Sequence, residues 1–257
     1  MIFVRDVMTK NPLCIEVDDS VTKVQSLMRD TGYRALPVVD NNKLVGIISR
    51  GDALTVTSRK TNIEVRGVMS HNVVTALPDE DIFSVTKKLT ESGIRQLPVI
   101  DKDGKIVGII SSMDILRVFL DNKYKTVKKK IRDVMSIDVV FCHEDDEISK
   151  IWNLIKKSGF GGLPVIDEKG KIKGIVTRMD ILRKRSVCIS KESGKRRKVT
   201  IRRVMIFKPY TIMADDTTEN AVRIMVSKKI IRLPVVDNNG MLVGIVDSED
   251  ILRSYLN

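Results

Sequence analysis

The sequence predicts a mixed α/β (α+β) fold made of four copies of one β-α-β-β-α unit. A Val-Met pair, a Leu-Pro-Val triplet and an Asp-Ile-Leu triplet (Asp-Ala-Leu in the first copy) each recur four times. The proline follows the methionine by 29 residues in every copy, and the aspartate follows the proline by 15 or 16 residues. Such constant spacing indicates a repeat architecture. The marks are Met8, Met69, Met135 and Met205; Pro37, Pro98, Pro164 and Pro234; and Asp52, Asp114, Asp180 and Asp250.

The hydrophobic periods within each copy predict the order of its elements. In copy one, a short strand at residues 12–17 leads to an acidic stretch ending in Ser20, which suits a capped helix start. Apolar residues then recur at helical spacing until Gly32 ends the helix. Two apolar strands follow, at 97–100 and 106–110 in copy two, joined by a turn typical of a hairpin. A second helix opens at the Asp-Ile-Leu mark.

Each copy is short, at about 60 residues, and has too few strands to close a core comfortably by itself. We therefore expect copies one and two to pair, and copies three and four to pair likewise. The predicted boundaries are 1–58, 62–120, 131–184 and 201–257 for the four copies, with basic linkers at 121–130 and 185–200.

The composition is that of a soluble globular protein, with 42% hydrophobic and 30% charged residues. No apolar run approaches the roughly 18 residues of a membrane span, and the N-terminus lacks the pattern of a signal peptide. We expect a cytoplasmic protein with no membrane association.

The cysteines and histidines are sparse, which favours a reducing compartment. Cys14, Cys142 and Cys188 lie far apart in the chain. Cys142 and His143 stand beside three acidic residues, which raises the question of a metal site. A solvated acidic loop before a helix is the favoured interpretation, because no second cluster of ligands would complete the coordination sphere.

The net charge of +12 is concentrated in two linkers. Residues 121–133 carry six basic and two acidic side chains, and residues 183–203 carry ten basic and one acidic. A solvated loop is the favoured interpretation of the second segment. Alternatives are a partner rich in anions, including nucleic acid, or a positive potential that acts on a nearby site. No aromatic residues interleave the segment as a single-strand binder requires.

A hydroxyl residue precedes the aspartate of the third mark by three residues in copies one to three, at Ser49, Ser111 and Thr177. This spacing is that of a capping box at a helix N-terminus. The same geometry offers free N–H groups, a hydroxyl and a carboxylate, which suit a ribose and a neighbouring phosphate. The two interpretations are compatible, so the spacing alone does not decide between them.

Arginines precede the Leu-Pro-Val mark in three copies, at Arg34, Arg95 and Arg232. Arginine at the entrance of a buried strand is a poor choice for packing but a good one for bidentate phosphate binding. Copy three has Gly161 and Gly162 there instead.

In register, these marks resemble the cystathionine β-synthase (CBS) domain family, whose domains occur as tandem pairs called Bateman modules. The resemblance covers almost the whole chain, and the four-copy arrangement is similar to the γ subunit of AMP-activated protein kinase and to stand-alone archaeal four-CBS proteins. It implies two Bateman modules packed into a disk. It also implies clefts that bind AMP, ADP, ATP or S-adenosylmethionine-type ligands.

The resemblance assigns roles to matching residues. It implies ribose binding by Asp52, Asp114, Asp180 and Asp250, phosphate contacts by Ser49, Ser111 and Thr177, phosphate clamps at Arg34, Arg95 and Arg232, and an adenine-side position for Thr9, Ser70 and Ser136. No catalytic or metal-binding residue and no catalytic cofactor is implied.

Copy four departs from this pattern twice. Ile206 replaces the hydroxyl after Val-Met, and Asp247 puts a carboxylate where a phosphate needs a donor. Its site is therefore expected to be empty or to prefer a nucleoside without phosphates. Arg232 also stands one residue nearer its proline than Arg34 and Arg95 do.

The leading hypothesis is a non-catalytic sensor of adenine nucleotides that is read by a regulated partner protein. A nucleic-acid-associated regulator and a scaffold with empty sites are the alternatives. Whether the two modules close a disk within one chain or through a homodimer is left open.

Overall fold

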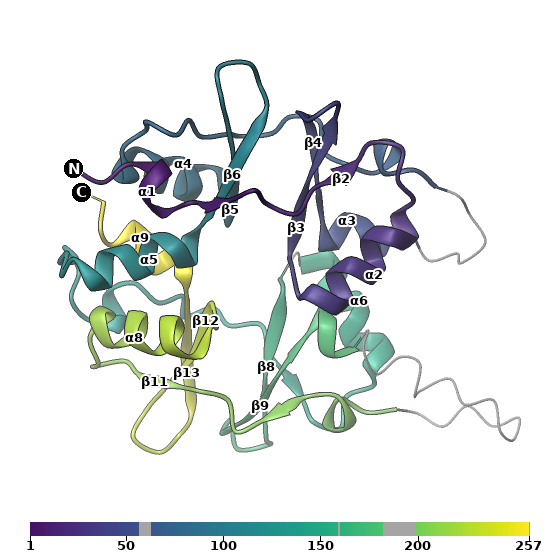
Figure 1. The fold of residues 1–257 in the computed structure, drawn as a ribbon. Helices are drawn as coiled ribbons and strands as arrows, with labels where there is room; N and C mark the ends of the chain where they lie inside the picture. The colour runs from purple at the N-terminus through teal and green to yellow at the C-terminus, as the bar shows by residue number, and fades with distance from the viewer. Residues whose placement is uncertain (57–62, 159, 182–198, 257) are drawn as a thin grey trace, which may run out of the picture. The chain divides into compact units, whose positions relative to one another are not determined.

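The computed structural model describes residues 1–56, 63–158, 160–181 and 199–256, which fall into two compact units (Figure 1). The first unit comprises residues 1–123 and the second residues 124–255. These limits place copies one and two in one unit and copies three and four in the other. The predicted pairing of the copies is confirmed.

The first unit contains two similar sets of elements. They are α1 (Val4–Val7), β1 (Thr9–Lys10), β2 (Ile15–Glu16), α2 (Val21–Thr31), β3 (Ala35–Asp40), β4 (Lys43–Ser49) and α3 (Arg50–Thr55), then η1 (Val65–Gly67), α4 (Ile82–Ser92), β5 (Gln96–Ile100), β6 (Ile106–Ser111) and α5 (Ser112–Asp121).

The second unit repeats the pattern. Its elements are η2 (Ile131–Asp133), β7 (Cys142–His143), α6 (Ile148–Ser158), β8 (Gly162–Ile166), β9 (Ile172–Thr177), η3 (Ile201–Arg203), β10 (Ile206–Phe207), β11 (Ile212–Met213), α8 (Thr218–Lys228), β12 (Arg232–Val236), β13 (Leu242–Asp247) and α9 (Ser248–Arg253). Residues 178–181 form a further helical turn.

Each copy has one topology, in which a short strand runs parallel to the Leu-Pro-Val strand and an antiparallel hairpin follows. In copy one, β2 pairs with β3 in parallel and β3 pairs with β4 in antiparallel register. Copies three and four repeat this with β7-β8-β9 and β11-β12-β13. In copy two the parallel strand is reduced to the bridge between Ala76 and Val99. The predicted β-α-β-β-α order and the α/β fold are confirmed.

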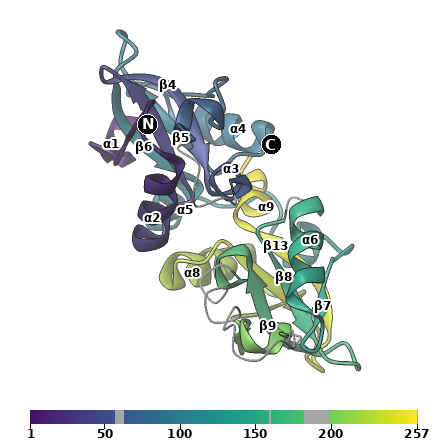
Figure 2. The ribbon, with the colours of Figure 1, turned by 90° about the vertical axis from the view of Figure 1, so that its right-hand side faces the viewer.

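The first helix of each copy covers the hairpin with an apolar face. Ser20 accepts a hydrogen bond from the amide of Lys23 at the start of α2, and Gly32, with φ of 80°, ends the helix in the left-handed conformation. Figures 1 and 2 show the same relation in copy three, where α6 lies beside β8. Ile151 and Ile155 of α6 are buried with Leu163 of β8 in one cluster. Burial of this helix face closes the core of each copy.

The hairpin turns explain why the aspartate follows the proline by 15 residues in copy one and by 16 residues in the other copies. Its two-residue turn places Asn41 and Asn42 at φ of 50° and 64°, which suits a tight hairpin. The longer turns of the other copies each place a glycine near φ of 80°, namely Gly104, Gly170 and Gly240.

The paired copies exchange short segments. Thr9 of copy one pairs with Ile109 on β6 of copy two, and Ser70 of copy two exchanges backbone hydrogen bonds of 2.9 and 3.0 Å with Ile47 on β4 of copy one. In the second unit, Ile206 pairs with Ile175, and Ser136 exchanges two bonds of 2.9 Å with Ile245. The segment after each Val-Met pair therefore lies on the last strand of the partner copy.

In every copy, a glycine of the last strand lies next to the methionine of the partner copy's Val-Met pair. A Cβ atom built on Gly46 would lie 2.5 Å from the sulfur of Met69, and one built on Gly244 would lie 2.7 Å from that of Met135. Gly108 and Gly174 face Met8 and Met205 in the same way. A side chain at any of these four glycines would overlap the methionine. The Gly-Ile-Ile or Gly-Ile-Val motif of one copy therefore packs directly against the Val-Met motif of its partner copy.

Within the described residues, no helix has the length and apolar character needed to cross a membrane.

Candidate functional site

The predicted hydroxyl and carboxylate lie together at the start of the second helix in each of copies one to three. The amide of Ser111 donates to Asp114 Oδ2 at 2.9 Å, and its hydroxyl donates to the same oxygen at 2.6 Å. Thr177 and Asp180 repeat both contacts at 2.8 and 2.6 Å. In copy one the amide of Ser49 donates to Asp52 at 2.9 Å. The capping box is therefore present, as the spacing predicts.

Capping occupies only one oxygen of the carboxylate. In the described part of the chain, the Oδ1 atoms of Asp114 and Asp180 accept no hydrogen bond, although both residues are partly exposed. A carboxylate oxygen held in place by the cap and still able to accept suits a ligand that carries hydroxyl groups.

The segment that follows each Val-Met pair adds a residue of the partner copy to each cluster. It pairs with the last strand of that cluster's copy, two residues before the position of Ser49, Ser111, Thr177 or Asp247. We define four candidate sites by the copy that supplies the aspartate. Site 1 comprises Ser49, Asp52 and Ser70; site 2 comprises Ser111, Asp114 and Thr9; site 3 comprises Thr177, Asp180 and Ile206; and site 4 comprises Asp247, Asp250 and Ser136.

This exchange corrects one expectation from the sequence. Ile206 and Asp247 both belong to copy four, and the sequence assigned them to one site. The expectation is wrong, because β10 carries Ile206 to β9 of copy three, whereas Asp247 meets Ser136 of copy three at site 4. Site 3 therefore lacks the exchanged hydroxyl but keeps Thr177, and site 4 keeps the exchanged hydroxyl but carries an extra carboxylate.

The three arginines do not occupy equivalent positions. Ala35 and Gln96 lie opposite Ser49 and Ser111 in the hairpin register, so Arg34 and Arg95 stand one residue outside the paired region. Arg232 lies within it, directly opposite Asp247. Arg34 is exposed and Arg95 is half-buried. Their roles as phosphate clamps stay predictions.

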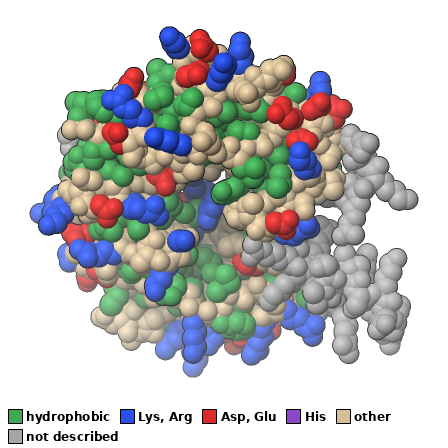
Figure 3. All heavy atoms as spheres, viewed as in Figure 1, with side chains coloured by type: hydrophobic (Ala, Val, Ile, Leu, Met, Phe, Trp, Pro, Cys, Tyr) green, Lys and Arg blue, Asp and Glu red, His purple; other side chains and the backbone are tan. Residues whose placement is uncertain are grey.

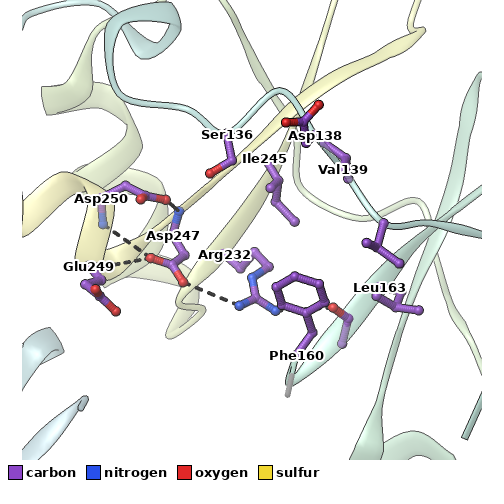
Figure 4. A pocket seen from close by; sticks show the side chains of 12 residues that line it. Ser136, Asp138, Val139, Phe160, Leu163, Arg232, Ile245, Asp247, Glu249 and Asp250 are labelled. Carbon is purple, nitrogen blue, oxygen red and sulfur yellow. Dashed lines mark hydrogen bonds and ion pairs between the residues drawn. The ribbon is translucent and has the colours of Figure 1, made fainter. Parts of the chain in front are cut away.

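A pocket of about 190 Å³ lies at site 4, built from copies three and four (Figure 4). Copy three supplies Ser136, Asp138, Val139, Val140, Phe160, Gly162 and Leu163, and copy four supplies Arg232, Ile245, Asp247, Glu249 and Asp250. The apolar side chains Val139, Val140 and Phe160 are lining residues that sequence reasoning missed. They occupy loop positions that carry no repeated mark, and only the folded chain brings them to site 4.

The guanidinium of Arg232 is engaged inside this pocket. Its Nη2 lies 3.4 Å from Asp247 Oδ2, and its Nη1 donates to the carbonyl oxygen of Gly162 at 3.2 Å. Gly162 also packs closely against β9, because a Cβ atom there would lie 2.7 Å from the carbonyl oxygen of Val176. Figure 4 shows Asp247 between Arg232 and the start of α9, where its Oδ1 accepts from the amides of Glu249 and Asp250 at 2.9 and 3.3 Å.

Burial and the neighbouring carboxylate of Asp247 raise the pKa of Asp250 to about 6. A carboxyl group whose pKa is higher in the folded than in the unfolded chain stabilises the fold most below its unfolded value. That contribution is lost as the pH rises through the folded value.

We predict that Asp250→Asn stabilises the second unit relative to the wild type by an amount that grows between pH 4 and pH 7. The expected increase is about 2 kcal/mol, since one pKa unit corresponds to about 1.4 kcal/mol and Asp250 is partly exposed. Trp152, the single tryptophan, packs against the core of copy three and reports urea unfolding of this unit by fluorescence. A difference that stays constant over this pH range would contradict the prediction.

Around Cys142 and His143, as elsewhere in the described residues, no group of three or more His, Cys, Asp or Glu side chains that could hold a metal ion occurs. Cys142 is buried in β7, and burial together with Asp146 raises the pKa of its thiol to about 12. His143 packs edge-on against Phe141. Asp146 accepts from the amide of His143 at 2.8 Å, so the acidic residue closes the loop before α6.

The face drawn in Figure 3 carries basic and acidic side chains interspersed among apolar ones. Most of the basic segment 183–203 lies outside the described residues. Its predicted role as a solvated loop or an anion-binding segment stays a prediction, as does the position of the linker boundaries.

Comparison with known proteins identifies relatives along the whole chain. The chain is 29% identical over 261 residues to protein MJ1404 of Methanocaldococcus jannaschii. This match covers 97% of this chain and 61% of MJ1404. The chain is also 26% identical to MJ1225 of the same organism, with 92% of each protein covered. The chain therefore spans about three fifths of one relative and about nine tenths of the other.

Two solved structures match the fold over nearly the whole chain. The crystal structure of MJ1225, described as a proposed archaeal homologue of g-AMPK, matches with a TM-score of 0.84 at 24% identity and covers 98% of this chain and 99% of that one. A conserved protein from Pyrococcus horikoshii matches with a TM-score of 0.74 at 24% identity, over 99% and 100% of the two chains. At these identities the matches show the fold.

The CBS domain family matches the chain at residues 4–59, 65–121, 131–186 and 201–257. These ranges contain the four Val-Met, Leu-Pro-Val and Asp-Ile-Leu marks and cover most of the chain. The chain therefore belongs to the CBS domain family and carries four CBS domains.

Proposed function

We propose that this protein is a non-catalytic cytoplasmic sensor that binds adenine nucleotides at sites shared by paired CBS domains. The observation that carries the proposal is the repeated pairing of a capped aspartate with a hydroxyl from the partner domain. Sites 1 and 2 each contain a Ser-x-x-Asp box and an exchanged Ser70 or Thr9. An aspartate oxygen that accepts from ribose hydroxyls, flanked by hydroxyl donors, suits AMP, ADP and ATP.

The exchange gives binding a route to regulation. Each site takes residues from two domains, so a ligand favours the arrangement of those domains that brings the residues together. A ligand shifts such an equilibrium by its difference in affinity for the two arrangements. We propose that a partner protein reads the arrangement, with AMP, ADP and ATP in competition.

Ligand-dependent stability tests this function. Saturating AMP is expected to stabilise the folded chain, by about 2.7 kcal/mol when free AMP is at 100 times its dissociation constant. The measurement is urea unfolding of the wild type with and without AMP, ADP and ATP, followed by circular dichroism. Cytidine monophosphate is the matched control, since it carries the same ribose phosphate. Equal stability with and without every adenine nucleotide would leave a scaffold with empty sites as the better account.

A further inference from the structure

The pocket at site 4 has a charge opposite to that needed for a phosphate. Among the described residues that line it, Asp138, Asp247, Glu249 and Asp250 are acidic and Arg232 is basic. Glu249 pairs with Arg253 at 2.8 Å, which reduces its contribution. Even without Glu249, three carboxylates stand against one guanidinium, so the pocket has an excess of negative charge.

The lone lining guanidinium is already committed. Arg232 and Asp247 are only 14% and 15% exposed, and Arg232 Nη1 also donates to Gly162. A phosphate that recruited Arg232 would have to take it from Asp247 and leave that carboxylate half-buried beside a second anion. Removing one partner of a buried ion pair is unfavourable, and like charges at short range repel.

The equivalent position in sites 1 to 3 holds a neutral hydroxyl. Ser49, Ser111 and Thr177 cap their helices with a neutral hydroxyl oxygen, whereas Asp247 caps α9 with a charged carboxylate that only accepts. The rest of site 4 keeps what a nucleoside needs. Asp250 Oδ1 accepts no hydrogen bond within the described residues, Ser136 supplies a hydroxyl, and Val139, Val140 and Phe160 offer apolar surface. The volume of about 190 Å³ is below the roughly 300–1,000 Å³ of most ligand pockets, which favours a small ligand.

We propose that site 4 binds an adenosine-type ligand whose 5′ substituent is cationic or neutral, and excludes nucleotides with a 5′-phosphate. This proposal rests on the proposed function, since it assigns one site of the same set a different ligand. The excess of carboxylates provides the selectivity by attracting a cationic substituent and repelling a phosphate, and Asp247 is the carboxylate that replaces the neutral hydroxyl of the other sites.

The first experiment assigns ligands to site 4 by difference. The full chain and its Asp250→Asn variant are titrated by calorimetry with AMP, adenosine and 5′-amino-5′-deoxyadenosine, whose amine carries a positive charge at neutral pH. The variant is expected to lose one binding site for each of the two phosphate-free ligands and none for AMP. The reverse pattern, with an AMP site lost, would overturn the proposal.

The second experiment changes the selecting residue. Asp247→Ser gives site 4 the residue of sites 1 and 2 and keeps an oxygen for the helix cap. At site 4 it is expected to weaken 5′-amino-5′-deoxyadenosine by at least about tenfold and to admit AMP, as expected from loss of one charge interaction. Asp145→Ser is the control, because Asp145 is exposed in the same unit and does not line the pocket. Asp247→Asn, which is isosteric and neutral, repeats the test if the serine variant unfolds.

The outcomes separate the two proposals. AMP binding at sites other than site 4, with phosphate-free ligands also confined to those sites, contradicts the site 4 assignment and leaves the sensor function standing. Binding of no adenine compound at any site contradicts both.

Discussion

Gly174→Ala is expected to destabilise the second unit by about 3 kcal/mol, the upper end of the usual cost of overpacking. A Cβ atom at this position would lie 2.8 Å from the carbonyl oxygen of Ile206 and 3.0 Å from the sulfur of Met205. The nearer atom belongs to the backbone of β10, so a rotamer change cannot relieve the overlap. The added methyl group must separate β10 from β9 and pull the exchanged segment off its partner domain.

Trp152 fluorescence during urea unfolding measures this effect, because the tryptophan packs against the cluster that contains Met205. Gly161→Ala is the matched control in the same unit, where the nearest atom to the new Cβ lies 4.0 Å away. Equal unfolding midpoints for the two variants would show that the glycine does not hold the exchanged contact.

Asp114→Asn is expected to weaken nucleotide binding at site 2 by about 10- to 100-fold. Hydrogen bonds to a charged group contribute about 1.5–3 kcal/mol, and Asp114 Oδ1 is the acceptor proposed for the ribose. An asparagine can still accept the amide hydrogen bond of Ser111 through its carbonyl oxygen. It then presents an NH₂ group to the ligand, so the cap survives and the acceptor is lost.

Calorimetric titration with AMP reports this as the loss of one site from the wild-type number. Asp103→Asn is the control, since Asp103 is exposed in the turn between β5 and β6 of the same domain. An unchanged number of sites and unchanged affinity in Asp114→Asn would contradict the ribose assignment.

The local parts of the fold could be predicted from the sequence because they depend on short spacings. The capping boxes at Ser111 and Thr177 follow from a three-residue interval, and the helix end at Gly32 follows from the glycine itself. The four copies follow from intervals that repeat along the chain. These features need no knowledge of which segments meet in space.

The assembly of each site could not be predicted, because it depends on contacts between distant residues. Thr9 pairs with Ile109, which lies 100 positions further along the chain, and Ile206 pairs with the strand of copy three and not with that of its own copy. The glycine of the Gly-Ile-Ile or Gly-Ile-Val motif and the methionine of the Val-Met motif recur in every copy. Their repetition is the one sequence feature that reflects the contact between these two motifs. Nothing in the order of residues indicates that Arg232 pairs with Asp247 and Gly162.

Isothermal titration of the wild-type chain with AMP measures whether sites built from a capped aspartate and a residue of the paired CBS domain bind adenine nucleotides. We expect saturable binding in the micromolar range with more than one site per chain. We expect fewer sites in a variant that carries Asp52→Asn and Asp114→Asn together. An absence of binding heat with AMP, ADP and ATP, with no change in stability, would contradict the proposed function.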